Sequence, residues 1–283
     1  MRGRFVDANS QRLHLVENRP NQPPELLFLH GVLRNWRSYY SILPAIQSNW
    51  SIAALDFRGH GRSSRGRSYL VQSYVDDVVA LLEQFDRPCA IYGHSLGAMV
   101  ALAVAGQRPQ KVCGLVLEDP PFSTMGQGFS QSPLLTYFRG VEACLYENPH
   151  SEIEPMFQAF SNIVVGRNRD GTPIVVRDQR DEQSRRFSAE CLLEVDPGVL
   201  APVTSQGWMH GYLLEKVVET IDCPVEMLQA DPSLGGMLVD ADVQVVKNQM
   251  KDRCHVQYFP NTPHSIHWAQ PKAAIDVIER IVG

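Results

Sequence analysis

The sequence lacks the features that mark several common classes of protein. No apolar run approaches the roughly 20 residues needed to cross a membrane. The net charge of −5 gives no basic excess for binding nucleic-acid phosphates. The basic residues within positions 1–7 are not followed by an apolar stretch, so we expect no secretory signal. We therefore expect no nucleic-acid partner and no membrane association.

Paired cysteines and metal-ligand clusters are also missing. The six cysteines are widely scattered and form no Cys-x-x-Cys pair. Several lie in apolar runs, where a free thiol behaves as a small hydrophobic side chain. We interpret them as reduced structural residues, which fits a cytoplasmic location. The pair His264-x-x-His267 is not accompanied by another Cys/His cluster, so we expect no metal and no cofactor.

What the chain does contain is a regular alternation of strand and helix patterns over its first 121 residues. The 283 residues are 44% hydrophobic and 20% charged, as in ordinary globular proteins. Polar–apolar alternation predicts two antiparallel strands at 3–8 and 11–16. Buried strands are predicted at 25–29, 51–55, 88–92 and 112–117, and helices at 36–46, 71–85 and 99–107. This order predicts an α/β fold with a mostly parallel sheet and helices on both faces.

The alternation stops after residue 121 and resumes near residue 213. Between these points the pattern predicts mainly helices, at 134–146, 153–164 and 177–193. Two further strands are then expected at 223–230 and 254–259, with helices at 240–250 and 271–282. We therefore predict a core made of residues 1–121 and 213–283, interrupted by a helical insertion at 122–212.

The stretch Gly93-His94-Ser95-Leu96-Gly97 is the strongest functional signal. An apolar strand precedes it and a helix rich in alanine and valine follows it. A strand, a Gly-x-Ser-x-Gly turn and a helix form a nucleophile elbow, a strained turn that presents one serine hydroxyl. Strand and helix pass close together there, which requires glycine on both sides. Ser95 is the predicted nucleophile.

Four segments in order carry a resemblance to a known family. They are His30-Gly31, the Asp-x-x-Gly-x-Gly-x-Ser segment at 56–63, the elbow, and Pro263-His264-Ser265. On these segments the chain resembles the α/β-hydrolase fold family, specifically its capped members. The resemblance covers about 1–121 and 213–283 and is weaker over 122–212. It implies that a helical cap is inserted after the strand that follows the elbow.

A serine hydroxyl is a poor nucleophile at neutral pH and needs a base, which in turn needs an orienting acid. The family order is serine, acid, histidine, so the resemblance implies His264 as the base. His267 is the local competitor. We interpret His255 as a core or surface residue and His94 as a packing residue.

The acid has two candidates. The commonest family spacing falls on Ser233, which is not an acid, so the chain departs from the pattern there. Asp231 lies two residues earlier in the same loop and is favoured. The alternative is Asp119, at the end of the strand after the elbow, where some family members keep their acid. Asp119-Pro120-Pro121 also has a purely structural interpretation, as a turn into the insertion.

The tetrahedral intermediate needs two backbone donors for its oxyanion. The resemblance implies the N–H groups of Leu96, which follows the nucleophile, and of Val32, which follows His30-Gly31. His30 is expected to brace this loop. The glycine-rich segment 56–61 lacks phosphate-loop spacing and is assigned a structural role.

The insertion is rich in aromatic residues, which predicts an apolar pocket for a small-molecule substrate. Arg167, Arg169 and Arg177 either face solvent or meet a substrate carboxylate. The leading hypothesis is a cofactor-free serine hydrolase of small or medium apolar esters, of carboxylesterase or lactonase type, acting through an acyl-enzyme as a monomer or homodimer. Two alternatives are a carbon–carbon bond hydrolase or lyase with the same triad, and a ligand-sensing protein with slow turnover. An elbow aspartate would have indicated haloalkane dehalogenase or epoxide hydrolase chemistry; Ser95 argues against both.

Overall fold

An eight-stranded sheet forms the centre of the molecule. The computed structural model describes residues 1–126, 129–149 and 152–283. The strand order is β1-β2-β4-β3-β5-β6-β9-β10. Strand β2 is antiparallel to β1 and β4, and all other neighbours are parallel, which confirms the predicted mostly parallel sheet. The strands are β1 Arg2–Ala8, β2 Gln11–Glu17, β3 Leu26–Leu29, β4 Ile52–Asp56, β5 Cys89–His94, β6 Val112–Glu118, β9 Val225–Gln229 and β10 Cys254–Tyr258.

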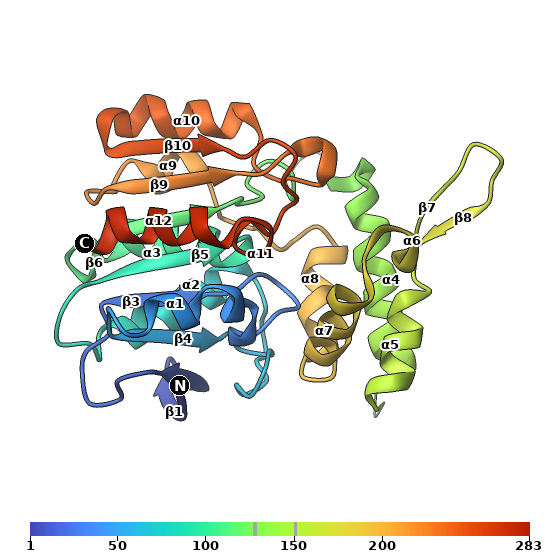
Figure 1. The fold of residues 1–283 in the computed structure, drawn as a ribbon, viewed down its shortest axis with the longest axis horizontal. Coiled ribbons are helices and arrows are strands. Elements are labelled where there is room, and N and C mark those ends of the chain that lie inside the picture. Colours follow the sequence, from blue (N-terminus) through green and yellow to red (C-terminus); the bar gives the residue numbers. More distant parts are fainter. Residues whose placement is uncertain (127–128, 150–151) are drawn as a thin grey trace.

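Helices cover both faces of this sheet, and each face has its own hydrophobic cluster. Helices α1 and α12 pack on one face and α2, α3 and α10 on the other (Figure 1). The core helices are α1 Leu43–Ile46, α2 Val71–Leu82, α3 Leu96–Gln107, α9 Leu214–Val218, α10 Asp240–Met250, α11 Ile266–Ala269 and α12 Pro271–Val282. The predicted helix at 36–46 is split into a 3-10 helix, Trp36–Ser41, and α1. Pro44 explains the break, because it has no N–H to continue the helical ladder.

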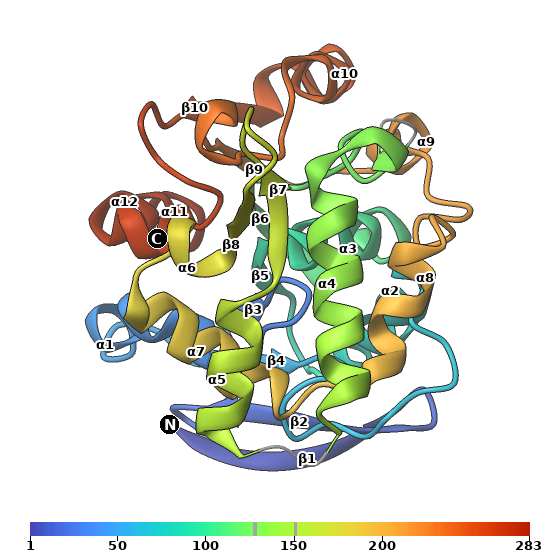
Figure 2. The same ribbon diagram turned by 90° about the vertical axis from the view of Figure 1, so that its right-hand side faces the viewer.

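Residues 122–212 lie at one end of the sheet and, in their described part, add no strand to it. In Figure 1 their elements form the green-to-gold group at the right, and Figure 2 views them from the front. Their elements are α4 Pro133–Glu147, α5 Ile153–Ser161, β7 Val164–Arg167, β8 Pro173–Val175, α6 Val176–Gln179, α7 Glu182–Leu192 and α8 Ala201–Thr204.

Two predicted helices in this segment differ from the structure: one ends early and the other is interrupted. The predicted helix 153–164 stops at Ser161, and the chain enters the hairpin β7–β8, which the sequence analysis did not predict. The β-branched run at 163–165 favours a strand over a helix. The predicted helix 177–193 is broken before α7, where the Asp181 side chain accepts a hydrogen bond from Ser184 N–H and caps a new helix.

Candidate active site

Ser95 has the strained backbone of a nucleophile elbow. It stands between β5 and α3 with φ +55° and ψ −115°, and it is buried. A Cβ atom on Gly97 would lie 1.8 Å from the carbonyl oxygen of Leu29, and one on Gly93 would lie 2.3 Å from that of Gly97. Only glycine fits at these two positions, as predicted from the motif.

The histidine expected after the last strand pairs with a carboxylate. His264 Nδ1 lies 2.6 Å from Asp119 Oδ2. The Asp119 side chain is fully buried, and Asp119 follows the last residue of β6 with φ +47°. Its carboxylate also accepts three backbone N–H groups, from Ala230, Met237 and Leu238, at 2.8–3.1 Å. These three N–H groups and His264 hold the Asp119 carboxylate in one position.

The favoured acid candidate, Asp231, does not contact His264 in the structure. The Asp231 carboxylate accepts hydrogen bonds from the backbone and hydroxyl of Ser233 and from Asn261 N–H. These bonds, with that from the Ser233 side chain foremost, lower the pKa of Asp231. Asp231 therefore caps its own loop, and the carboxylate beside His264 is the alternative candidate, Asp119.

His264 lies directly against the elbow. Its ring centre is 4.6 Å from that of His94, and His94 Nε2–H donates to the carbonyl of His264 at 3.2 Å. Burial lowers the pKa of His94 far below its usual value, so this ring is neutral and packs as expected. No hydrogen bond joins Ser95 to His264, both of which the structure describes. Such bonds are often long or poorly aligned in unliganded enzymes.

The competitor His267 is occupied by a second carboxylate. His267 Nδ1 lies 2.7 Å from Glu118 Oε2, and its Nε2–H donates to the Ser38 carbonyl at 3.1 Å. Both partners are buried. Burial opposes ionisation of Glu118, but the positive charge of His267 and the hydrogen bonds from His267 and Tyr92 outweigh it and lower the pKa of Glu118 to about 2. This ion pair fastens the loop that carries His264 to the end of β6.

Two neutral histidines brace the loop after β3. His30 Nδ1–H donates to the Gly31 carbonyl at 2.8 Å, and His30 Nε2 accepts Phe57 N–H at 3.0 Å. His60 Nε2 accepts Leu33 N–H at 3.2 Å. Burial lowers the pKa of His30 to about 4 and that of His60 to about 3. The bracing role expected for His30 is confirmed.

The braced loop runs past Ser95. A Cβ atom on Gly31 would lie 3.3 Å from Ser95 Cβ. Within the described chain, neither Val32 N–H nor Leu96 N–H donates to a protein acceptor. Two backbone donors next to the elbow are thus left available.

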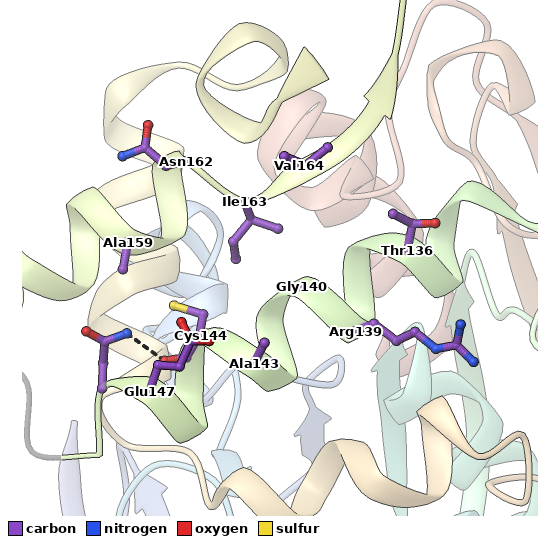
Figure 3. Close-up of a pocket in the computed structure, with 11 residues that line it drawn as sticks. Thr136, Arg139, Gly140, Ala143, Cys144, Glu147, Ala159, Asn162, Ile163 and Val164 are labelled. Atoms are coloured by element: carbon purple, nitrogen blue, oxygen red, sulfur yellow. Dashed lines mark hydrogen bonds between the residues drawn. The ribbon is translucent and has the colours of Figure 1, made fainter. Parts of the chain in front are cut away.

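A hollow of about 490 Å³ lies away from the Ser95 site. It lies between α4, α5 and β7 and is lined by residues such as Gly140, Cys144 and Ile163 (Figure 3). None of its lining residues belongs to the Ser95 site. Among the described residues, no group of three or more His, Cys, Asp or Glu side chains is arranged to hold a metal ion. Within the same residues, no helix combines the length and apolarity needed to cross a membrane.

Comparison with known proteins agrees with the fold. The family model of the alpha/beta hydrolase fold matches residues 24–136. Epoxide hydrolase B of Mycobacterium tuberculosis is 33% identical over 130 residues, a match that covers 44% of this chain but only 36% of that protein. The pimeloyl-(acyl-carrier protein) methyl ester esterase of Neisseria meningitidis is 31% identical over 196 residues, covering 64% of this chain and 74% of the esterase.

Among solved structures, E-2-(acetamidomethylene)succinate hydrolase superposes with a TM-score of 0.73 at 19% identity, covering 99% of this chain and 98% of that one. The chain therefore belongs to the α/β-hydrolase fold family, as its resemblance implied.

Proposed function

We propose that the protein is a serine hydrolase of carboxylic esters, with Ser95 as nucleophile, His264 as base and Asp119 as orienting acid. The observation that carries this proposal is the 2.6 Å contact between His264 Nδ1 and the buried Asp119 carboxylate, beside a serine with the strained backbone of an elbow. That contact keeps the Nδ1 proton on the side of the acid, which leaves Nε2 free to accept a proton.

The reaction follows the acyl-enzyme route. Ser95 Oγ attacks the ester carbonyl carbon as its proton passes to His264 Nε2. The C–O bond to the alcohol then breaks, and the alcohol leaves with the proton from Nε2. A water molecule attacks the acyl-enzyme in the same way, giving the acid and restoring Ser95. We assign the N–H groups of Val32 and Leu96 to the oxyanion of each tetrahedral intermediate, because both are free beside the elbow.

The relatives support an ester over an epoxide. One relative is a methyl ester esterase and matches over 64% of this chain. The other is an epoxide hydrolase, for which we expect an aspartate in the elbow, whereas this chain has Ser95.

Residues 122–212 serve as a cap over the site in this proposal, as the resemblance implied. They contact the loop after β3 (residues 30–34, the oxyanion loop) through α7. The Arg34 side chain of this loop donates to Ser188 Oγ at 3.1 Å. Partly buried aromatic side chains of the cap, Tyr137 and Phe187 among them, supply apolar surface for a small-molecule substrate.

The test is hydrolysis of p-nitrophenyl esters of graded acyl length by the wild type, Ser95→Ala and His264→Ala. We expect turnover in the wild type and a loss of about 10³-fold or more in each variant, because the two side chains act as a unit. The absence of turnover by folded wild-type protein on every ester would contradict the proposal and favour carbon–carbon bond substrates. Residual activity of Ser95→Ala equal to the wild type would remove Ser95 as the nucleophile.

A further inference from the structure

Arg34 and Arg180 lie where the oxyanion loop meets the cap, near enough for the charge of Arg180 to act on Arg34. Arg34 lies in the loop after β3. Its backbone N–H donates to the Gly31 carbonyl at 3.2 Å and closes a tight turn. The ends of such a turn lie within about 7 Å of each other. The Arg34 side chain therefore starts close to Gly31, where an added Cβ atom would lie 3.3 Å from Ser95 Cβ. From there it extends to α7, where its guanidinium lies 5.8 Å from the centre of the Phe187 ring.

Arg180 comes from the other side, between α6 and α7. Its guanidinium lies 5.1 Å from the centre of the Tyr137 ring and 6.0 Å from that of Phe160. Both arginines are partly buried. Aromatic faces accommodate a guanidinium but do not neutralise its charge.

Neither arginine has a carboxylate partner among the ion pairs of the described residues. The acids of α7 and its C-terminal end, Glu190 and Glu194, pair instead with Arg37. Burial lowers the pKa of Arg34, and the positive charge of Arg180 lowers it further. Two like charges partly withdrawn from water without a counter-ion destabilise a protein, and an anion bound between Arg34 and Arg180 would offset this cost.

We propose that Arg34 and Arg180 bind a carboxylate at the far end of the acyl chain of the substrate. This rests on the proposed ester hydrolysis at Ser95 and names its substrate class: esters of dicarboxylic acids with one free carboxylate. Guanidinium groups bind carboxylates through paired, charge-assisted hydrogen bonds. In this arrangement the ester carbonyl of the substrate lies against the oxyanion loop, and Arg34 extends from the same loop. We therefore place the free carboxylate of the substrate on its acyl chain. The rings of Tyr137 and Phe187 contact the methylene chain.

The arginines singled out from the sequence are a different group. Arg167 donates to the Gly171 carbonyl of its own hairpin, and Arg177 donates to the side chain of Asn162. Arg169 is exposed on the hairpin turn. They provide a control for general charge effects, since they share the cap with Arg180 but do not meet the oxyanion loop.

The test compares two methyl esters of equal length, monomethyl adipate and methyl hexanoate, which differ in one terminal carboxylate. The quantity measured is the ratio of their kcat/KM values, by titration of released acid at constant pH. We expect the wild type to prefer monomethyl adipate about tenfold or more, the worth of one charge-assisted hydrogen-bonded contact. Arg34→Met and Arg180→Met should each remove most of this preference, whereas Arg169→Met should keep it.

Equal kcat/KM values for the two esters in the wild type would overturn the proposal while leaving ester hydrolysis intact. If the wild type hydrolyses neither ester, the result counts against the proposed function. Calorimetric titration with adipate then tests the carboxylate site without relying on hydrolysis. Saturable adipate binding that Arg34→Met weakens about tenfold and Arg169→Met does not would support it. Absence of binding, or equal binding by all three proteins, would overturn it.

Discussion

Replacing Asp119 with asparagine is the sharpest test of the proposed catalytic arrangement. The Asp119 carboxylate meets two backbone N–H groups on Oδ1, from Ala230 and Leu238, and one on Oδ2, from Met237. An asparagine amide has one acceptor oxygen, which the two donors at the Oδ1 position will attract. Its NH2 group then faces His264 Nδ1, forcing that nitrogen to accept. The ring proton moves to Nε2, and His264 can no longer take a proton from the nucleophile.

The expected loss is large because the tautomer is wrong as well as the charge. In serine proteases the same substitution lowers kcat by about 10⁴, which corresponds to about 5.5 kcal/mol of transition-state stabilisation. Asp119→Asn should also lower the free energy of unfolding by about 1–3 kcal/mol, because Met237 N–H loses its acceptor. Initial rates with a p-nitrophenyl ester and urea unfolding measure the two effects.

Asp231→Asn is the matched control. The Asp231 carboxylate accepts hydrogen bonds from Ser233 and Asn261, which lie in the loops after β9 and β10, and does not contact His264. It should keep kcat within about threefold of the wild type. A folded Asp119→Asn protein with near wild-type kcat, or a 10³-fold loss in Asp231→Asn, would refute this assignment of the acid.

Three further predictions concern stability. Gly97→Ala should lower the free energy of unfolding, measured by urea titration, by about 3 kcal/mol or more, because its Cβ would collide with the Leu29 carbonyl. Gly207→Ala is the control, since the site at Gly207 is open and should tolerate a Cβ atom. The pKa of His60 falls from 6.5 in the unfolded chain to about 3 in the folded protein. Its neutral state therefore contributes stability that is lost as the pH drops below about 6.5. His60→Gln should make the free energy of unfolding depend less steeply on pH between 6.5 and 4.5, and an unchanged slope would contradict this. The pKa of Glu118 falls from 4.5 to about 2 on folding, so its contribution is present above pH 4.5 and lost as the pH falls towards 2. Glu118→Gln should cost about 3–5 kcal/mol at pH 7, and adding His267→Gln should cost less than the sum of the single losses, as measured in a double-mutant cycle.

Long periodic segments were predicted well because their pattern reflects burial. The predicted helices 240–250 and 271–282 have the bounds of α10 and α12. The ends of the buried strands also lie within two residues of their predicted positions. Two errors were breaks that depend on single residues, Pro44 and the Asp181 cap, which interrupt a continuous helical pattern. A third was the hairpin β7–β8, which the helical pattern of 153–164 concealed.

The sequence ranked Asp231 above Asp119 because spacing along the chain does not report the direction in which a loop backbone points. Asp231 stands in the loop where the acid was sought. In the structure this loop contributes backbone N–H groups, from Ala230, Met237 and Leu238, to a carboxylate that arrives from β6. Only the three-dimensional path of residues 230–238 distinguishes a loop that carries an acid from one that binds it.

A signal for the proposed acid was nevertheless present in two segments considered together. Glu118 ends β6 and Asp119 follows it directly with φ +47°, so two carboxylates leave one strand end side by side in the sequence. His264 and His267 are three residues apart in one loop, and each takes one of the two carboxylates, at 2.6 and 2.7 Å. One pair is fully buried, and the other keeps a partly exposed histidine beside Ser95. The buried pair of Glu118 and His267 thus holds the loop in place, and the pair of Asp119 and His264 orients the proposed base. The proposed acid and the residue that anchors this loop are therefore consecutive at one strand end.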